Sequence, residues 1–283
     1  MLMELIDRGM SIARLNLAHC THKFAVQVIT DVRAYSKASN IQVAIWLDIN
    51  GPKVRSGRLA GGKPVKLTKG LLANKGSEFQ FVNDVNLLGD ATQVATTYTK
   101  ELVHKGDVIC VDDGMLSFVV VDRLDNSIKT IVETSGILGE NKGITFPHNV
   151  IRDLPAISAQ DKQDVAFAIE HKIDFISVSS LRDTEDVKEL RLLLGNSPIK
   201  MFAKIENKRG MDNFESVLSI SDGVVLDRGY LGSEVDLELV VIGQKRMIAQ
   251  VTEINTGEYG RQTYFCCKPD FRIDGDTSPP NTL

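Results

Sequence analysis

The chain has 283 residues, of which 43% are hydrophobic and 25% are charged, and its formal net charge is −4. This composition is typical of a globular protein with one large domain or two smaller ones, and it argues against nucleic-acid or membrane-surface partners. No apolar run reaches the roughly 18 residues of a membrane span, and no signal-peptide pattern opens the chain. The cysteines lack metal-ligand spacing and are typical of reduced thiols. We therefore expect a cytoplasmic protein.

The first region, residues 1–51, alternates helical and strand patterns. Residues 2–7 form an amphipathic pattern that ends before Gly9, and residues 11–17 are typical of a short strand. A second helix is expected to begin at Thr21, because an apolar stripe with helical spacing follows it. Residues 41–47 are mostly apolar, which is typical of a strand covered on both faces.

The second region, residues 52–152, has a different texture. It is punctuated by glycine and lacks any long helical period. Short alternating segments, which predict strands, occupy residues 64–67, 108–111, 116–121 and 127–133. This pattern predicts an inserted small all-β domain, either a sandwich or a small barrel.

The helix–strand alternation returns from residue 153. Ser158 is typical of a helix N-cap, and later helices are expected at residues 184–194, 212–220 and 237–250, with strands at 173–178, 199–205 and 223–226. Repeated units of about 30 residues predict a partial (β/α)8 barrel of the TIM type, formed by residues 1–51 and 153–250. Residues 251–283 lack apolar periodicity and are expected to form an irregular or disordered tail.

Polar clusters follow five of the predicted strands. They lie at residues 14–19, 48–55, 177–182, 204–207 and 227–232. Any one cluster is more often a set of cap or loop residues, but together they indicate a site for anionic ligands at the carboxyl ends of the strands. Lys204 and Glu206 are two positions apart and should therefore point to the same face. An ammonium and a carboxylate there can hold a divalent metal together with a phosphoryl oxygen.

Several motifs occur in the same order as in one known family. Arg14-x-Asn16-x-x-His19 and Asp48-x-x-Gly51-Pro52-x-x-Arg55 precede Val111-Asp112-Asp113-Gly114, and Asp153-Leu154-Pro155-Ala156 marks the return to the barrel. Lys204-Ile205-Glu206-Asn207 is identical to the most specific motif of that family. From residue 2 to residue 250, the sequence resembles the pyruvate kinase family.

The resemblance implies phosphoryl transfer between phosphoenolpyruvate and ADP, which gives pyruvate and ATP and requires Mg²⁺. It implies that Lys204 stabilises the transferring phosphoryl group, that Arg14 faces the phosphate and that Glu206 is one of two Mg²⁺ ligands. Substrate or nucleotide binding would fall to Asn16, His19, Arg55, Lys142 and Gly229.

The sequence also departs from the family pattern at ion-binding positions. Tyr230 stands where the family has the second Mg²⁺ carboxylate, and a protonated phenol is a poor Mg²⁺ ligand. Asp48 and Asn16 match residues of the monovalent-cation pocket, where Lys53 would replace K⁺ by its ammonium. We therefore expect weakened catalysis and no requirement for K⁺.

The match leaves three interpretations open. The chain resembles a divergent pyruvate kinase shortened at both ends, since the family's first strand and the segment that carries a catalytic threonine find no counterpart. It could be an impaired enzyme, a non-catalytic relative that binds a full-length pyruvate kinase or a phosphorylated metabolite, or a truncated gene product. Homo- or hetero-oligomers with pyruvate kinase are the expected protein partners.

Overall fold

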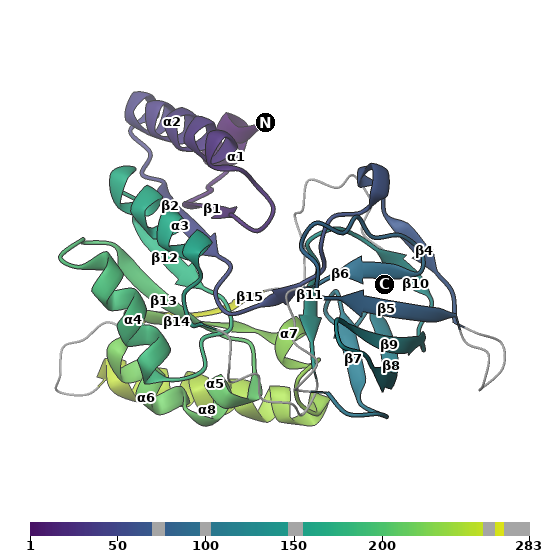
Figure 1. Cartoon of the computed structure of the whole chain (residues 1–283). Coiled ribbons are helices and arrows are strands. Elements are labelled where there is room, and N and C mark those ends of the chain that lie inside the picture. Colours follow the sequence, from purple (N-terminus) through teal and green to yellow (C-terminus); the bar gives the residue numbers. More distant parts are fainter. Residues whose placement is uncertain (70–76, 97–102, 147–154, 257–263, 269–283) are drawn as a thin grey trace.

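The computed structural model describes residues 1–69, 77–96, 103–146, 155–256 and 264–268, and two β-sheets organise it (Figure 1). The first sheet has six parallel strands in the order β1-β2-β12-β13-β14-β15. These strands are β1 (Ile12–Asn16), β2 (Ala44–Ile49), β12 (Phe175–Val178), β13 (Lys200–Ile205), β14 (Gly223–Asp227) and β15 (Tyr264–Lys268). Their carboxyl ends therefore lie along one edge of the sheet.

Helices connect these strands and cover one face of the sheet (Figure 1). They are α1 (Leu2–Asp7), α2 (His22–Ser39), α3 (Ala159–Glu170), α4 (Thr184–Leu194), α5 (Lys208–Asp212), α6 (Phe214–Ile220), α7 (Arg228–Leu231) and α8 (Leu237–Thr256). Capping residues start several of them as the sequence predicts: the Thr21 hydroxyl accepts a hydrogen bond from the Phe24 amide, and Ser158 forms a capping box with Asp161. Within the described parts of the chain, none of the helices combines the length and apolar character needed to cross a bilayer.

The second sheet is built from residues that lie between β2 and α3. Seven strands pair in the order β3-β11-β7-β8-β9-β5-β6, antiparallel except for the β5–β6 pair, and β4 pairs with β10 beside them. The strands are β3 (Val54–Arg55), β4 (Val65–Leu67), β5 (Glu78–Val82), β6 (Gln93–Ala95), β7 (Val108–Val111), β8 (Leu116–Arg123), β9 (Ser127–Val132), β10 (Gly136–Leu138) and β11 (Gly143–Thr145). Phe79, Phe81 and Phe118 pack against one another in its separate core.

The mixed α/β class predicted from the sequence is confirmed, while closure into a TIM-type barrel and the division into domains stay predictions. The proposed boundary between residues 152 and 153 lies outside the described residues.

The irregular tail predicted for residues 251–283 was wrong at residues 251–256 and 264–268, which are the parts of it that the structure describes: α8 continues to Thr256, and β15 pairs in parallel with β14. A strand of five residues, flanked by glycine and proline signals, is too short to show a period. The helix predicted at residues 212–220 is confirmed as α6, but the short helix α5 that precedes it was missed. The Asn207 side chain caps α5 by accepting a hydrogen bond from the Gly210 amide at 2.7 Å.

Side chains alternate between the two faces of the parallel sheet, and this alternation positions the polar residues. Ile45 and Leu47 lie in the core under the helices. Trp46, on the opposite face, packs against Phe202 of β13 with ring centroids 4.9 Å apart. Two positions further along each strand, Asp48 and Lys204 follow Trp46 and Phe202. The face opposite these helices is therefore aromatic in the middle of the strands and charged at their carboxyl ends.

Candidate functional site

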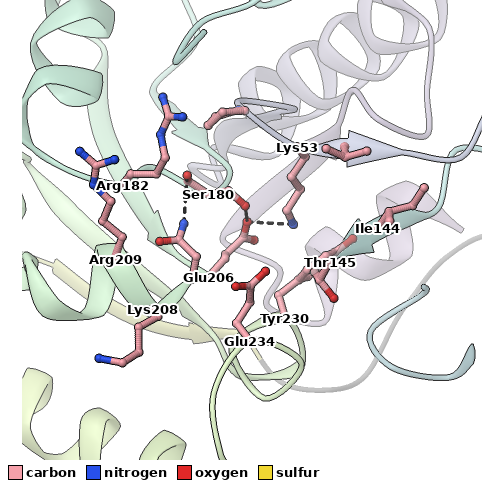
Figure 2. Close-up of a pocket in the computed structure, with 13 residues that line it drawn as sticks. Lys53, Ile144, Thr145, Ser180, Arg182, Glu206, Lys208, Arg209, Tyr230 and Glu234 are labelled. Atoms are coloured by element: carbon pink, nitrogen blue, oxygen red, sulfur yellow. Dashed lines mark hydrogen bonds and ion pairs between the residues drawn. The ribbon is translucent and has the colours of Figure 1, made fainter. Parts of the chain in front are cut away.

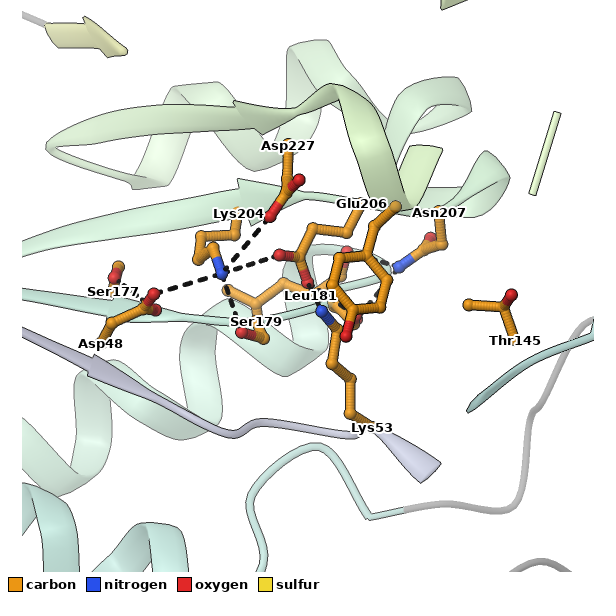
Figure 3. A network of polar contacts seen from close by, with 12 residues as sticks. Asp48, Lys53, Thr145, Ser177, Ser179, Leu181, Lys204, Glu206, Asn207 and Asp227 are labelled. Carbon is orange, nitrogen blue, oxygen red and sulfur yellow. Dashed lines mark hydrogen bonds and ion pairs between the residues drawn. The ribbon is translucent and has the colours of Figure 1, made fainter. Parts of the chain in front are cut away.

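The Lys204 ammonium is the centre of a buried polar cluster (Figure 3). Its Nζ lies 2.7 Å from Glu206 Oε1, 3.0 Å from Ser179 Oγ and 3.3 Å from Asp48 Oδ2, and Asp227 Oδ2 is 4.0 Å away. The Lys204 side chain is only 5% exposed. Burial alone would lower the pKa of Lys204, but the neighbouring carboxylates of Asp48 and Glu206 outweigh burial and raise it. Lys204 is therefore a permanently charged group at neutral pH.

Asp48 is held by partners on three strands. Its Oδ1 accepts a hydrogen bond from Ser177 Oγ at 2.8 Å, and Ser177 Oγ in turn accepts one from Trp46 Nε1 at 2.8 Å. The Arg14 guanidinium of β1 pairs with Oδ2. Burial would raise the pKa of Asp48, but the charges of Lys204 and Arg14 lower it below its ordinary value. Asp48 thus fixes two cations, one from β1 and one from β13.

The loop after β2 approaches the cluster closely at Gly51. This residue has φ +61°, and a Cβ there would overlap the carbonyl oxygen of Ser179. The Gly51 amide donates a hydrogen bond to Asp161 Oδ1 at 3.0 Å, which ties the loop to the first turn of α3. A glycine is required by both its conformation and its surroundings. The tight turn brings Lys53 back over the carboxyl end of β13.

Lys53 and Lys204 bind opposite oxygens of one carboxylate. Lys53 Nζ lies 2.8 Å from Glu206 Oε2, which also accepts a hydrogen bond from Ser180 Oγ at 2.8 Å (Figure 2). The same ammonium lies 3.0 Å from the centroid of the Tyr230 ring. Burial lowers the pKa of Lys53 to about 8, although Glu206 opposes this shift. The pKa of Glu206 is well below its ordinary value, because Lys204 and Lys53 outweigh the effect of burial.

A pocket of about 340 Å³ opens beside this cluster, between the two sheets (Figure 2). Its walls come from the Lys53 loop, the end of β11, and the segments that follow β12, β13 and β14. The labelled lining residues are Lys53, Ile144, Thr145, Ser180, Arg182, Glu206, Lys208, Arg209, Tyr230 and Glu234. A second pocket of about 470 Å³ shares Lys53 and is also lined by Arg55 and Asn141. Lys53 therefore borders both pockets.

Glu234 gives the first pocket a pH-sensitive group. Burial raises the pKa of Glu234 to about 8, and Lys53 opposes this shift. Between the ordinary pKa of 4.5 and about 8, the folded state therefore holds a proton that the unfolded state has lost. This stabilising contribution is complete below pH 4.5 and is lost as the pH rises to about 8.

We expect Glu234→Gln to remove this contribution. In urea unfolding, the free energy of unfolding of the wild-type protein should be lower at pH 8 than at pH 5, and Glu234 should account for roughly 3 kcal/mol of this decrease. The decrease should be smaller by that amount in the variant. An equal pH dependence in both proteins would contradict the assignment. Glu185→Gln, at an exposed position in the first turn of α4, is the matched control.

The structure brings five of the residues predicted from the sequence into one cluster: Arg14, Asp48, Lys53, Lys204 and Glu206. The expectation that Lys204 and Glu206 share a face is confirmed. Ser177 and Ser179 belong to the polar cluster predicted at residues 177–182, but the sequence assigned no contact to their hydroxyl groups. They lie two positions apart at the end of one predicted strand, which was the available signal.

The other predicted residues lie around the cluster with partners of their own. Asn16 Oδ1 accepts a hydrogen bond from the Ala18 amide at 3.0 Å, in the turn after β1 that also contains the exposed His19. Arg55 donates to the Asn141 carbonyl at 2.9 Å. Two further residues lie beside the loop after β7. Lys142 pairs with Asp112 at 3.3 Å, and Gly229 in α7 lies so close to Asp113 that a Cβ on Gly229 would contact it. Their roles in binding stay predictions.

The donor set around Glu206 does not fit a divalent cation. Each oxygen of Glu206 already faces an ammonium, although the contact of Oε1 with Lys204 is an ion pair without hydrogen-bond geometry. Burial raises the pKa of Tyr230, so its phenol stays protonated. Within the described ranges, no three acidic, histidine or cysteine side chains converge as a metal site. The role of Glu206 as a Mg²⁺ ligand is therefore not supported by this geometry.

At the predicted monovalent-cation pocket, as at Glu206, the carboxylate oxygens already contact side chains of the protein. Both oxygens of Asp48 are engaged by Ser177 and by the cations of Arg14 and Lys204. The Lys53 ammonium contacts Glu206 rather than Asp48. Lys53 thus supplies a fixed positive charge, but it lies beside Glu206 and not in the pocket of Asp48 and Asn16 that the sequence suggested. The absence of a K⁺ requirement stays a prediction.

Comparison with known proteins agrees with the motifs. The family model described as pyruvate kinase, barrel domain, matches residues 1–257. Pyruvate kinase PKLR from Rattus norvegicus is 38% identical over 263 residues, which cover 88% of this chain and 45% of that protein. Pyruvate kinases from Schizosaccharomyces pombe and Clostridium perfringens are 34% and 36% identical, and 49% and 52% of their lengths are covered. The chain spans about half the length of the curated relatives it matches, and it belongs to the pyruvate kinase family.

Proposed function

We propose that this chain binds phosphoenolpyruvate at the carboxyl ends of β2, β12, β13 and β14 and transfers its phosphoryl group to ADP. The single observation that carries the proposal is the position of the Lys204 ammonium. Three side-chain oxygens lie within 3.3 Å of it and hold it beside an open pocket. Relatives that carry the name pyruvate kinase support the choice of substrates. The reaction consumes a proton and gives pyruvate and ATP.

The residues of the cluster supply what phosphoryl transfer needs most, which is positioning and positive charge. The enol P–O bond breaks while a bond to a terminal phosphate oxygen of ADP forms, so negative charge spreads over the phosphoryl oxygens. Lys204 and Arg14 face this charge, and Asp48 keeps both cations in place. The Arg14 side chain is 37% exposed and can therefore be reached from solvent. These cations would stabilise the transferring group without moving.

The second pocket supports a binding place for the nucleotide, separate from the Lys204 cluster. The second pocket, which is lined by Arg55 and adjoins Lys53, is large enough for part of a nucleotide. We infer that the parallel sheet is part of a (β/α)8 barrel of the TIM type and that residues 52–152 form an inserted all-β domain over the cleft. Because the donor set around Glu206 does not fit Mg²⁺, we expect slow turnover. Metal clamping contributes several kcal/mol to such reactions.

The test is an enzyme-linked assay for pyruvate, with ADP and phosphoenolpyruvate as substrates. The wild-type chain should show slow turnover above the blank, and Lys204→Met should lower it by about 10²–10³-fold, the effect of removing one charge-stabilising group. Lys200→Met is the matched control, because this exposed lysine lies on the same strand at its amino end and pairs with Asp222. Its rate should equal that of the wild type. Wild-type turnover at the level of the blank would overturn the proposal.

A second candidate function is binding without catalysis, as in a relative that captures a phosphorylated metabolite or a full-length pyruvate kinase. The observation in its favour is that Lys53 and Tyr230 occupy the surroundings of Glu206. The same assay separates the candidates when it is combined with calorimetry. Saturable binding of phosphoenolpyruvate without turnover would favour the binding protein.

A further inference from the structure

The charges of the buried cluster balance without any added ion. Three cations, Arg14, Lys53 and Lys204, face three carboxylates, which are Asp48, Glu206 and Asp227. A site that attracts a divalent cation usually presents an excess of carboxylate charge and free oxygen ligands. This cluster has neither the excess charge nor a Glu206 oxygen without an ammonium beside it.

Lys53 is held in its place from two sides. Its side chain is 6% exposed, and its ammonium lies between Glu206 Oε2 at 2.8 Å and the face of the Tyr230 ring at 3.0 Å from the centroid. The ring itself is fixed by close packing, because a Cβ on Gly143 of β11 would overlap the Tyr230 hydroxyl. The ammonium is thus desolvated and has both an ionic and a cation–π partner. Removing it would leave Glu206 with less charge compensation.

We propose that the Lys53 ammonium, held between Glu206 and the Tyr230 ring, replaces a divalent cation, so that this site binds its phosphorylated acid without a divalent metal. The identity of the anion rests on the proposed function, but the replacement itself does not. A dication would have to displace a buried ammonium and would find a neutral ring at position 230 where it needs an oxygen anion. Three fixed cations would then face the ligand in place of two cations and a metal.

Binding of Mn²⁺ to the full chain, in the absence of any substrate, tests this inference. Mn²⁺ is followed by electron paramagnetic resonance, because the signal of the free ion disappears when the ion binds. The wild-type protein should bind Mn²⁺ no more tightly than about 1 mM. The double variant Lys53→Met/Tyr230→Asp should bind at least about tenfold more tightly, because it removes the ammonium and adds a carboxylate.

Two further variants keep the test decisive. Tyr230→Phe retains the ring above Lys53 and should bind Mn²⁺ as weakly as the wild type. Lys53→Met alone retains the packing of Tyr230 and should still tighten binding if the double variant does not fold, as judged by circular dichroism. Micromolar Mn²⁺ binding by the wild type, or no gain in a folded variant that lacks Lys53, would overturn the inference. Because no substrate is present, either failure leaves the proposed phosphoryl transfer to be judged by its own assay.

Discussion

Replacing Lys204 with methionine should lower the free energy of unfolding by about 3–5 kcal/mol, because it removes the cation shared by several buried carboxylates. Asp48 and Glu206 are 1% exposed and Asp227 is 2% exposed, so water cannot take the place of the ammonium. Methionine keeps most of the volume of lysine, so the change reports charge rather than packing. Urea unfolding followed by circular dichroism measures the effect.

Lys200→Met serves as the control for this prediction as well. Lys200 is 57% exposed in its side chain, and its ion pair with Asp222 spans 3.5 Å, so its loss should change stability by less than about 0.5 kcal/mol. If Lys204→Met were as stable as the wild type, the carboxylates would have to be protonated or solvated in the folded protein. That result would contradict the charged cluster described above.

Replacing Trp46 with alanine should cost about 3–5 kcal/mol, the usual range for removing a large buried aromatic side chain. Trp46 packs against Phe202 and Phe175, with ring centroids 4.9 Å and 6.0 Å away. Trp46→Phe keeps an aromatic ring but loses the hydrogen bond from Nε1 to Ser177 Oγ. It should therefore cost about 1 kcal/mol from that bond, in addition to a smaller loss of packing.

Circular dichroism during urea unfolding should follow these variants, because Trp46 is the single tryptophan and its fluorescence disappears with it. Phe24→Ala is the matched control. Phe24 lies on α2 and is 56% exposed, so its truncation should cost less than about 1 kcal/mol. Equal losses of unfolding free energy in Trp46→Ala and Phe24→Ala would show that the aromatic cluster does not stabilise the sheet.

The elements that follow a local period could be predicted from the sequence. Thr184–Leu194 is a helix over the predicted range, and the alternation that runs along β13 to the residue after it placed Lys204 and Glu206 on one face. The strand at Tyr264–Lys268 was missed, because its stability depends on pairing with β14 rather than on its own pattern. Local propensity thus accounts for the elements but not for all of their partners.

The partners within the site depend on contacts between distant segments. The hydrogen bond from Ser177 to Asp48 follows from the register of β12 against β2, which are 129 residues apart at this point. The contact of Lys53 with Glu206 follows from the turn at Gly51, where φ is positive. Sequence motifs identified most of the charged residues, but the pairing of each charge required the three-dimensional structure.

The central claim is that the Lys204 cluster binds a phosphorylated acid, and calorimetric titration with phosphoenolpyruvate tests it most directly. The titration is made in the presence of EDTA with the wild type, Lys204→Met and the control Lys200→Met, after circular dichroism has shown that each protein is folded. We expect saturable binding by the wild type and by Lys200→Met, and a loss of at least about tenfold in affinity for Lys204→Met. The absence of binding by the folded wild type, or equal affinity in all three proteins, would contradict the claim.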